Sequence, residues 1–136
     1  MALIIGPAIA LGLIIGAYEA IIIHRDVRVP THRMGHMMHA LILSIVFVLV
    51  AMNTQYVIDM GLGGIPVLGN VHIVRVLVGL IAAIKIHGTS RAVKGAGAGV
   101  GMGETWFHSI LIGALIAASP YIYPIVEPMI PGFMKF

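Results

Sequence analysis

The stretch HRDVRVPTHRMGHMMH, residues 24–39, separates the first two long apolar runs of the chain. It holds four of the seven histidines, and it places Arg25, Arg28 and Arg33 beside a single acid, Asp26. Cations concentrated between two apolar runs are typical of a loop on the cytoplasmic side of a membrane. The stretch therefore predicts two transmembrane helices joined by a basic loop.

The composition indicates an integral membrane protein. Of the 136 residues, 60% are hydrophobic and 10% are charged, whereas soluble domains carry about 25% charged residues. So little charge leaves too little polar surface to cover a water-soluble globule. The formal net charge is +3, but the basic residues lie at the ends of apolar runs, which argues against nucleic-acid binding. Because the chain has no cysteine, disulfides and thiolate metal ligands are excluded.

Four apolar runs predict four transmembrane helices, since one crossing needs about 20 apolar residues. The runs cover residues 1–23, 31–60, 71–87 and 104–126. We expect the first run to be retained as a helix, because it lacks the basic start of a signal peptide. Its small residues Ala8, Gly12 and Gly16 recur every four positions, and Glu19 continues the stripe. We expect this stripe to face another helix.

An internal similarity predicts two tandem hairpins. The matching residues are Gly16, Ala20, His24 and Arg28 with Gly79, Ala83, His87 and Arg91, and then Met34 and Gly35 with Met102 and Gly103. We interpret residues 1–66 and 67–136 as hairpin repeats within a single transmembrane domain. Because each repeat crosses twice, both have the same orientation. The predicted fold is an all-α bundle of four transmembrane helices with a pseudo-two-fold axis along the membrane normal.

The basic loops set the expected orientation. Loops 24–35 and 88–103 both carry cations and lie on the same side of a protein with four crossings. The preference of cations for the inside places both loops in the cytoplasm. We therefore expect a protein of the cytoplasmic (plasma) membrane with both termini outside.

Histidines and carboxylates concentrate at the predicted cytoplasmic ends of the helices. The candidate metal ligands are His36, His39, His87, His108, Glu19 and Glu104. Such a set suits a transition metal in a helix bundle. Alternatively, His39 and His108 could hold haem b between facing helices, with Gly35 and Gly103 leaving room for the ring. The structural alternative is that these histidines lie at the headgroup level and bind lipid phosphates or cap helix ends. No catalytic residue is assigned.

Arg75 is a charged residue near the start of the third apolar run. A charge in such a run either reaches the membrane surface or meets an acid. Asp59 and Glu127 lie at the same predicted end of the helices. The sequence predicts an ion pair of Arg75 with one of them, or a side chain that extends to water.

Three classes of function follow. The favoured one is a non-catalytic structural or accessory subunit of a larger or homo-oligomeric membrane assembly, whose partners are the lipid bilayer and other transmembrane helices. The second is a membrane protein with a histidine-ligated metal or b-type haem, active in electron transfer or oxidative chemistry. The third is a small carrier or channel. Polar residues concentrate at the ends of the apolar runs, which argues against a conduit through one copy.

Overall fold

The computed structural model describes residues 3–26, 30–94 and 105–135, with side chains for residues 3–21, 37–88 and 105–135. Within these residues every regular element is a helix, and there is no strand. The four long helices are α1 (Gly6–Asp26), α2 (Pro30–Met52), α4 (Val71–Lys94) and α5 (Trp106–Val126). The short segments are α3 (Thr54–Val57), the π-helical η1 (Ile58–Leu62), and the 3-10 helical η2 (Glu127–Met129) and η3 (Gly132–Met134). The prediction of an all-α fold is confirmed.

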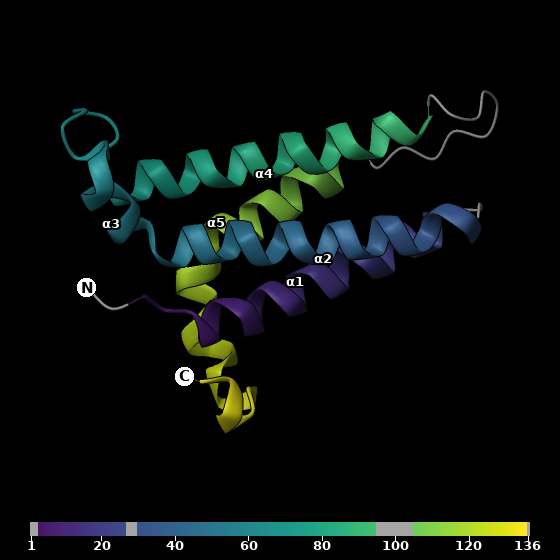
Figure 1. Cartoon of the computed structure of the whole chain (residues 1–136), viewed down its shortest axis with the longest axis horizontal. Helices are drawn as coiled ribbons and strands as arrows, with labels where there is room; N and C mark the ends of the chain where they lie inside the picture. Colours follow the sequence, from purple (N-terminus) through teal and green to yellow (C-terminus); the bar gives the residue numbers. More distant parts are fainter. Residues whose placement is uncertain (1–2, 27–29, 95–104, 136) are drawn as a thin grey trace.

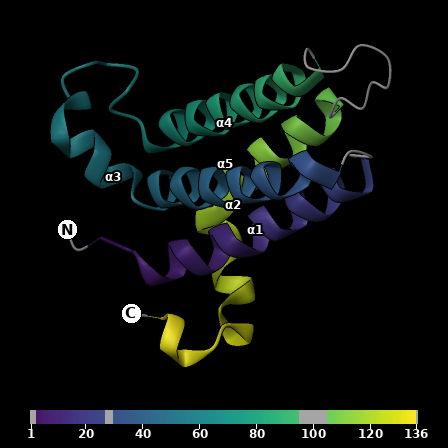
Figure 2. The ribbon, with the colours of Figure 1, turned by 45° about the vertical axis from the view of Figure 1, so that its right-hand side comes forward.

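The long helices pack as two antiparallel pairs. Helix α1 packs along α2, and α4 packs along α5, while α2 also contacts α4 and α5. In Figures 1 and 2, α5 crosses behind α2, and its C-terminal part emerges on the far side of α1. The end of α1, the start of α2, the end of α4 and the start of α5 all lie on the right of Figure 1. These four helix ends therefore lie at one end of the molecule.

Glycines bring the paired helices into backbone contact. On α1, Gly12 and Gly16 face α2, and a Cβ atom on Gly12 would lie 2.6 Å from Cα of Ile45. On α4, a Cβ atom on Gly79 would lie 2.5 Å from the carbonyl oxygen of Gly113. Both distances are far inside van der Waals contact, so only glycine allows these approaches. The expected small-residue stripe on the first helix is a packing face.

One apolar core is shared by all four long helices. Each helix contributes side chains that are fully or almost fully buried, such as Leu11, Val48, Ala82 and Ile112. Many large apolar side chains on the opposite faces are exposed. This combination is expected of helices whose outer faces contact lipid or other helices.

The second apolar run, expected as one helix over 31–60, is bent by 76° after Met52. Asn53 lies at the bend with φ −107° and ψ 29°. The next residue, Thr54, is buried and its hydroxyl donates to the carbonyl oxygen of Ala51 at 2.7 Å. Such back-bonding by threonine competes with regular helix geometry and bends helices. The run therefore divides into α2 and the α3–η1 segment.

The Asn53 side chain also fixes the start of the chain. Its Oδ1 accepts from the backbone N–H of Ile4 at 2.7 Å, and its Nδ2 donates to the carbonyl oxygen of Ile4 at 3.0 Å. Nδ2 also donates to the carbonyl oxygen of Leu49 at 2.8 Å. One buried carboxamide thus joins the segment before α1 to the end of α2.

The N-termini of α4 and α5 are each capped by a side chain. The Oδ1 atom of Asn70 accepts from the backbone N–H groups of His72 at 2.9 Å and Ile73 at 3.3 Å. Thr105 precedes α5, and its hydroxyl accepts from the backbone N–H of His108 at 3.4 Å. These caps satisfy N–H groups that have no partner inside the helix.

Two described helices are long and apolar enough to cross a membrane, namely Val71–Gly88 and Trp106–Met129. The bent pair Met37–Met52 and Thr54–Leu62 makes a third if it counts as one span. The described apolar part of α1, Gly6–Ile21, is shorter. By length and composition, two to three helices are therefore suited to a membrane.

Candidate functional site

The structure describes the side chains of four of the six predicted metal ligands. The side chain of His36 and the whole of Glu104 lie outside the described residues. The others, Glu19, His39, His87 and His108, have described surroundings. Among the described side chains, no group of three or more histidines and carboxylates lies close enough together to hold a metal ion.

Glu19 is buried between α1 and α2, with 3% of its surface exposed. The hydroxyl of Ser44, which is itself fully buried, donates to Oε2 of Glu19 at 2.9 Å. A buried carboxylate needs such donors, because burial removes its contacts with water. The Glu19–Ser44 hydrogen bond therefore supplies a buried polar contact between α1 and α2.

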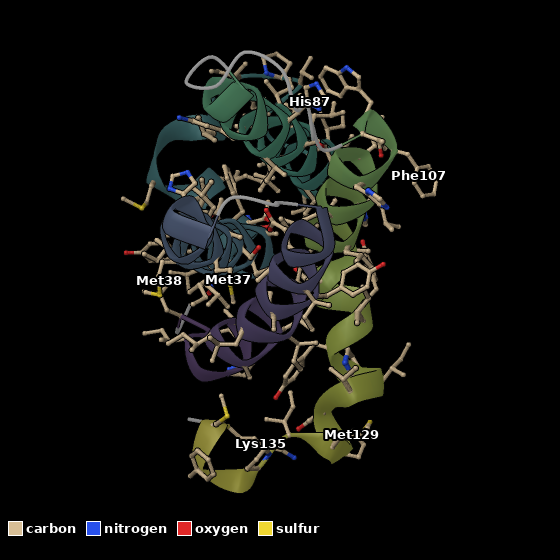
Figure 3. All side chains as sticks on the ribbon, turned by 90° about the vertical axis from the view of Figure 1, so that its right-hand side faces the viewer. Met37, Met38, His87, Phe107, Met129 and Lys135 are labelled. Atoms are coloured by element: carbon tan, nitrogen blue, oxygen red, sulfur yellow. The ribbon has the colours of Figure 1, made fainter. Side chains whose placement is uncertain are left out.

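His87 lies between α4 and α5 and is 6% exposed. Its ring stacks on Trp106, with 3.8 Å between the centroids and 16° between the planes. Nδ1 of His87 lies 3.4 Å from the hydroxyl of Ser109. Figure 3 shows His87 on the side of α4 nearer to α5, whereas Phe107 points away from the helices. These three residues, His87, Trp106 and Ser109, form the His87 cluster, which joins the end of α4 to the start of α5.

His108 and His39 have separate surroundings. Nδ1 of His108 lies 3.2 Å from the hydroxyl of Thr105, the residue that caps α5. Its ring also meets Phe107 edge to face, with 5.8 Å between the centroids. His39 is exposed on α2. His108 thus takes part in the start of a helix, as the structural alternative expects, while the metal and haem sites stay predictions.

A polar cluster that the sequence did not predict lies at the other end of α4 and α5. Nη1 of Arg75 donates to the hydroxyl of Tyr121 at 3.0 Å, and the guanidinium carbon lies 5.3 Å from the centre of the tyrosine ring. The same hydroxyl lies 2.7 Å from Nδ1 of His72. The rings of His72 and Tyr121 are nearly parallel, at 11°. We call His72, Arg75 and Tyr121 the Arg75 cluster.

The expected ion pair of Arg75 with Asp59 or Glu127 is wrong. Within the described residues, Arg75 bonds to Tyr121, and Asp59 accepts instead from Nε2 of Gln55 at 2.8 Å. Residues 55 and 59 are one turn apart on the same helical segment, so this bond is local. One feature of the sequence could have indicated the Arg75 cluster. The predicted antiparallel pairing of the third and fourth helices places the start of α4, with Arg75, beside the end of α5, with Tyr121.

The described polar groups thus connect helices at both ends of a shared apolar core. The protein is all-helical, with two to three helices that are suited to crossing a membrane, which is consistent with location in a membrane. No model of a known protein family matches the chain, and neither a curated protein nor a solved structure matches it.

Proposed function

We propose that this chain is a non-catalytic structural or accessory subunit of a larger or homo-oligomeric membrane assembly. Its partners in this proposal are the bilayer and other transmembrane helices. The described polar side chains support it, because those of the Glu19–Ser44 contact, the His87 cluster and the Arg75 cluster each connect one helix to another. Such contacts hold a scaffold together.

The observation that carries the proposal is the exposure of apolar side chains in the C-terminal part of the structure. Ile125, Met129 and Phe133 are 76%, 84% and 80% exposed, respectively. We call these three residues the C-terminal apolar residues. Figure 3 places Met129 at the far end of the molecule from α4, where the chain has left the shared core. Exposed apolar side chains of a membrane protein contact lipid or another protein, and we propose that these three contact another protein.

We further propose that the chain crosses the bilayer four times, as hairpins formed by residues 1–66 and 67–136. The glycine contacts within each antiparallel pair support this arrangement. The two hairpins differ in the register of their helices. In the first, Gly16 faces Leu41; in the second, the corresponding Gly79 faces Gly113. Gly113 lies about one helical turn beyond the residue that corresponds to Leu41 in the repeat. The pseudo-two-fold relation would therefore be approximate.

Cysteine cross-linking tests the assembly, because the chain has no native cysteine. The variant Ile125→Cys places one thiol among the C-terminal apolar residues. The variant Ile84→Cys is the matched control, since Ile84 is 61% exposed on α4. In native membranes we expect oxidation to cross-link the Ile125→Cys chain to a second copy or to another subunit. Equal yields for both variants, or no product from either, would contradict the proposal.

Thiol labelling of intact cells tests the topology. We expect Gly64→Cys, between α3 and α4, to react with a membrane-impermeant reagent from outside. We expect Gly88→Cys, near the end of α4, to react only after the cells are made permeable. Gly64 and Gly88 are exposed, and neither has an atom within 4 Å of the position where a Cβ would be, so both substitutions are tolerable. Labelling of both from the same side would overturn four crossings.

An absorption spectrum with metal analysis separates this proposal from the redox class. Protein purified from its native membrane should show no Soret band and no stoichiometric transition metal. Either signal, if lost on His39→Ala or His108→Ala, would replace the structural role with a haem or metal protein.

A further inference from the structure

The positive charge of Arg75 has no acidic partner in the described part of the chain. Its described contacts are the hydroxyl and ring of Tyr121, and Asp59 bonds to Gln55 instead. Nε of Arg75 is buried and has no hydrogen-bond acceptor among the described residues. A guanidinium at the end of an apolar helix is strongly stabilised by an anion. None of the described residues supplies one.

One tautomer of His72 makes the hydrogen bonds of the Arg75 cluster run in one direction. Arginine can only donate, so the Tyr121 oxygen accepts from Nη1 of Arg75. The phenolic hydrogen is then available to Nδ1 of His72, 2.7 Å away. With Nδ1 as the acceptor, the ring N–H of His72 is on Nε2. In this tautomer the cluster ends in N–H donors, from Arg75 on one side of the hydroxyl and from His72 on the other.

The shape of the cluster suits a tetrahedral oxyanion. Arg75 lies over the ring of Tyr121, and the ring of His72 is nearly parallel to it. The hydrogen bond to Tyr121 uses only Nη1 of the guanidinium. Guanidinium groups bind phosphate through two parallel N–H donors, and stacking on an aromatic ring fixes the guanidinium plane. His72 and Tyr121 are exposed, so a ligand can reach them from outside the helices.

The depth of the cluster fits a phospholipid headgroup. The candidate span Val71–Gly88 begins one residue before His72 and four before Arg75. The N–H groups of His72 and Ile73 are already bonded to Asn70, so the end of the helix itself offers few donors. The side chains of the cluster must provide recognition, at the level where helices leave the hydrocarbon.

We propose that the Arg75 cluster binds one phosphate group, with Arg75 as the charged ligand, His72 as a second donor and Tyr121 as the residue that positions both. The phosphate belongs either to a phospholipid or to a free inorganic anion. Neither the assembly proposed above nor the candidate metal ligands enter this inference.

Native mass spectrometry of the delipidated full chain tests the proposal. The probes are phosphatidylglycerol, a galactolipid of the same acyl chains without phosphate, and inorganic phosphate. We expect one tight phosphatidylglycerol adduct and no comparable galactolipid adduct. If inorganic phosphate does not displace the lipid, the ligand is a headgroup. If it does, and also binds alone, the site takes the free anion.

The variant Arg75→Gln should weaken the adduct by at least about tenfold, because it removes a charge-assisted hydrogen bond. Lys135→Gln is the matched control: it also removes one exposed cation, beyond the C-terminal end of α5, and should leave binding unchanged. If Arg75→Gln does not fold, Arg75→Lys and His72→Gln serve in its place. Arg75→Lys keeps the charge and loses the two-point geometry, and His72→Gln changes the second donor, so each should weaken binding.

The proposal is overturned if Arg75→Gln, or its folded substitutes, bind phosphatidylglycerol as wild type does. It is also overturned if the galactolipid binds as tightly as phosphatidylglycerol, because acyl chains alone would then explain the adduct. A loss of binding in Lys135→Gln equal to that in Arg75→Gln would show an unspecific effect of surface charge and would have the same consequence.

Discussion

Gly79 and Gly113 are in direct backbone contact where α4 packs on α5. A Cβ atom on Gly113 would lie 2.4 Å from the carbonyl oxygen of Gly79 and 2.9 Å from Cβ of Ala83. In a membrane, lipid tails are as apolar as the helix faces, so close packing rather than apolar burial holds helices together. This contact should therefore determine how firmly the second hairpin is held.

We expect Gly113→Ala to destabilise the protein by about 1–3 kcal/mol, because the added methyl group forces the two backbones apart. Gly88→Ala is the control on α4, since no atom of another helix in the described structure lies within 4 Å of its Cβ position. It should be neutral or stabilising, as alanine favours helix more than glycine does. The free energy of unfolding in mixed micelles measures both. Equal effects of the two variants would contradict the tight contact.

Asn53→Ala should release the start of the chain, because Asn53 makes both side-chain bonds to the backbone of Ile4. The loss of these buried hydrogen bonds is expected to cost about 1–3 kcal/mol. Hydrogen exchange at the Ile4 amide should become faster. Gln55→Ala, which removes only an exposed bond to Asp59, should leave that amide unchanged. Unaltered protection of Ile4 in Asn53→Ala would show that another contact holds the segment.

The sequence predicted the helices well and their breaks poorly. Apolar runs located all four long helices, and the spacing of Gly12 and Gly16 predicted the face of α1 that packs on α2. The bend after Met52 was missed: a single threonine in an apolar run does not mark a break, although Thr54 bonds back to Ala51 there. The contact of Asn53 with Ile4, which is distant in the sequence, was missed as well. The third helix was expected to end near His87 and continues to Lys94. The local pattern of apolar and polar residues does not show which residues distant in the sequence will be in contact.

The polar clusters were predicted only in part, because they too depend on contacts between residues that are distant in the sequence. Glu19 was expected to face protein, and it does, but its partner Ser44 carries no sequence signal among the apolar residues of α2. For Arg75, charge alone suggested an acid, whereas the structure supplies the hydroxyl and ring of Tyr121. Which side chains meet depends on the register of α4 against α5, which the Gly79–Gly113 contact fixes.

Two serines should respond in opposite ways to the loss of the hydroxyl. Ser44 and Ser119 are both fully buried, but Ser44 donates to Glu19, and the Ser119 hydroxyl has no hydrogen-bond partner in the described structure. We expect Ser44→Ala to cost about 1–3 kcal/mol, because Glu19 loses a donor. Ser119→Ala should be neutral or stabilising, because it removes an unbonded polar group. Unfolding measurements that find equal losses would contradict both assignments.

Trp106 is the only tryptophan in the chain, so its fluorescence reports on the His87 cluster alone. Its ring stacks on His87 at 3.8 Å, and 49% of the residue is exposed. We expect His87→Ala to uncover the stacked face, which shifts the emission to longer wavelength and increases quenching by acrylamide. Loss of the stacked pair should also cost about 0.5–1.5 kcal/mol beyond the loss of buried area.

His87→Phe and His39→Ala are the controls for this measurement. Phenylalanine keeps an aromatic ring against Trp106 but removes the nitrogen that lies 3.4 Å from the Ser109 hydroxyl. Its emission should therefore stay near that of wild type. His39 is exposed on α2, so its removal should have no effect. If His87→Ala leaves the emission unchanged, or if His39→Ala shifts it equally, the stack does not hold the end of α4 to the start of α5.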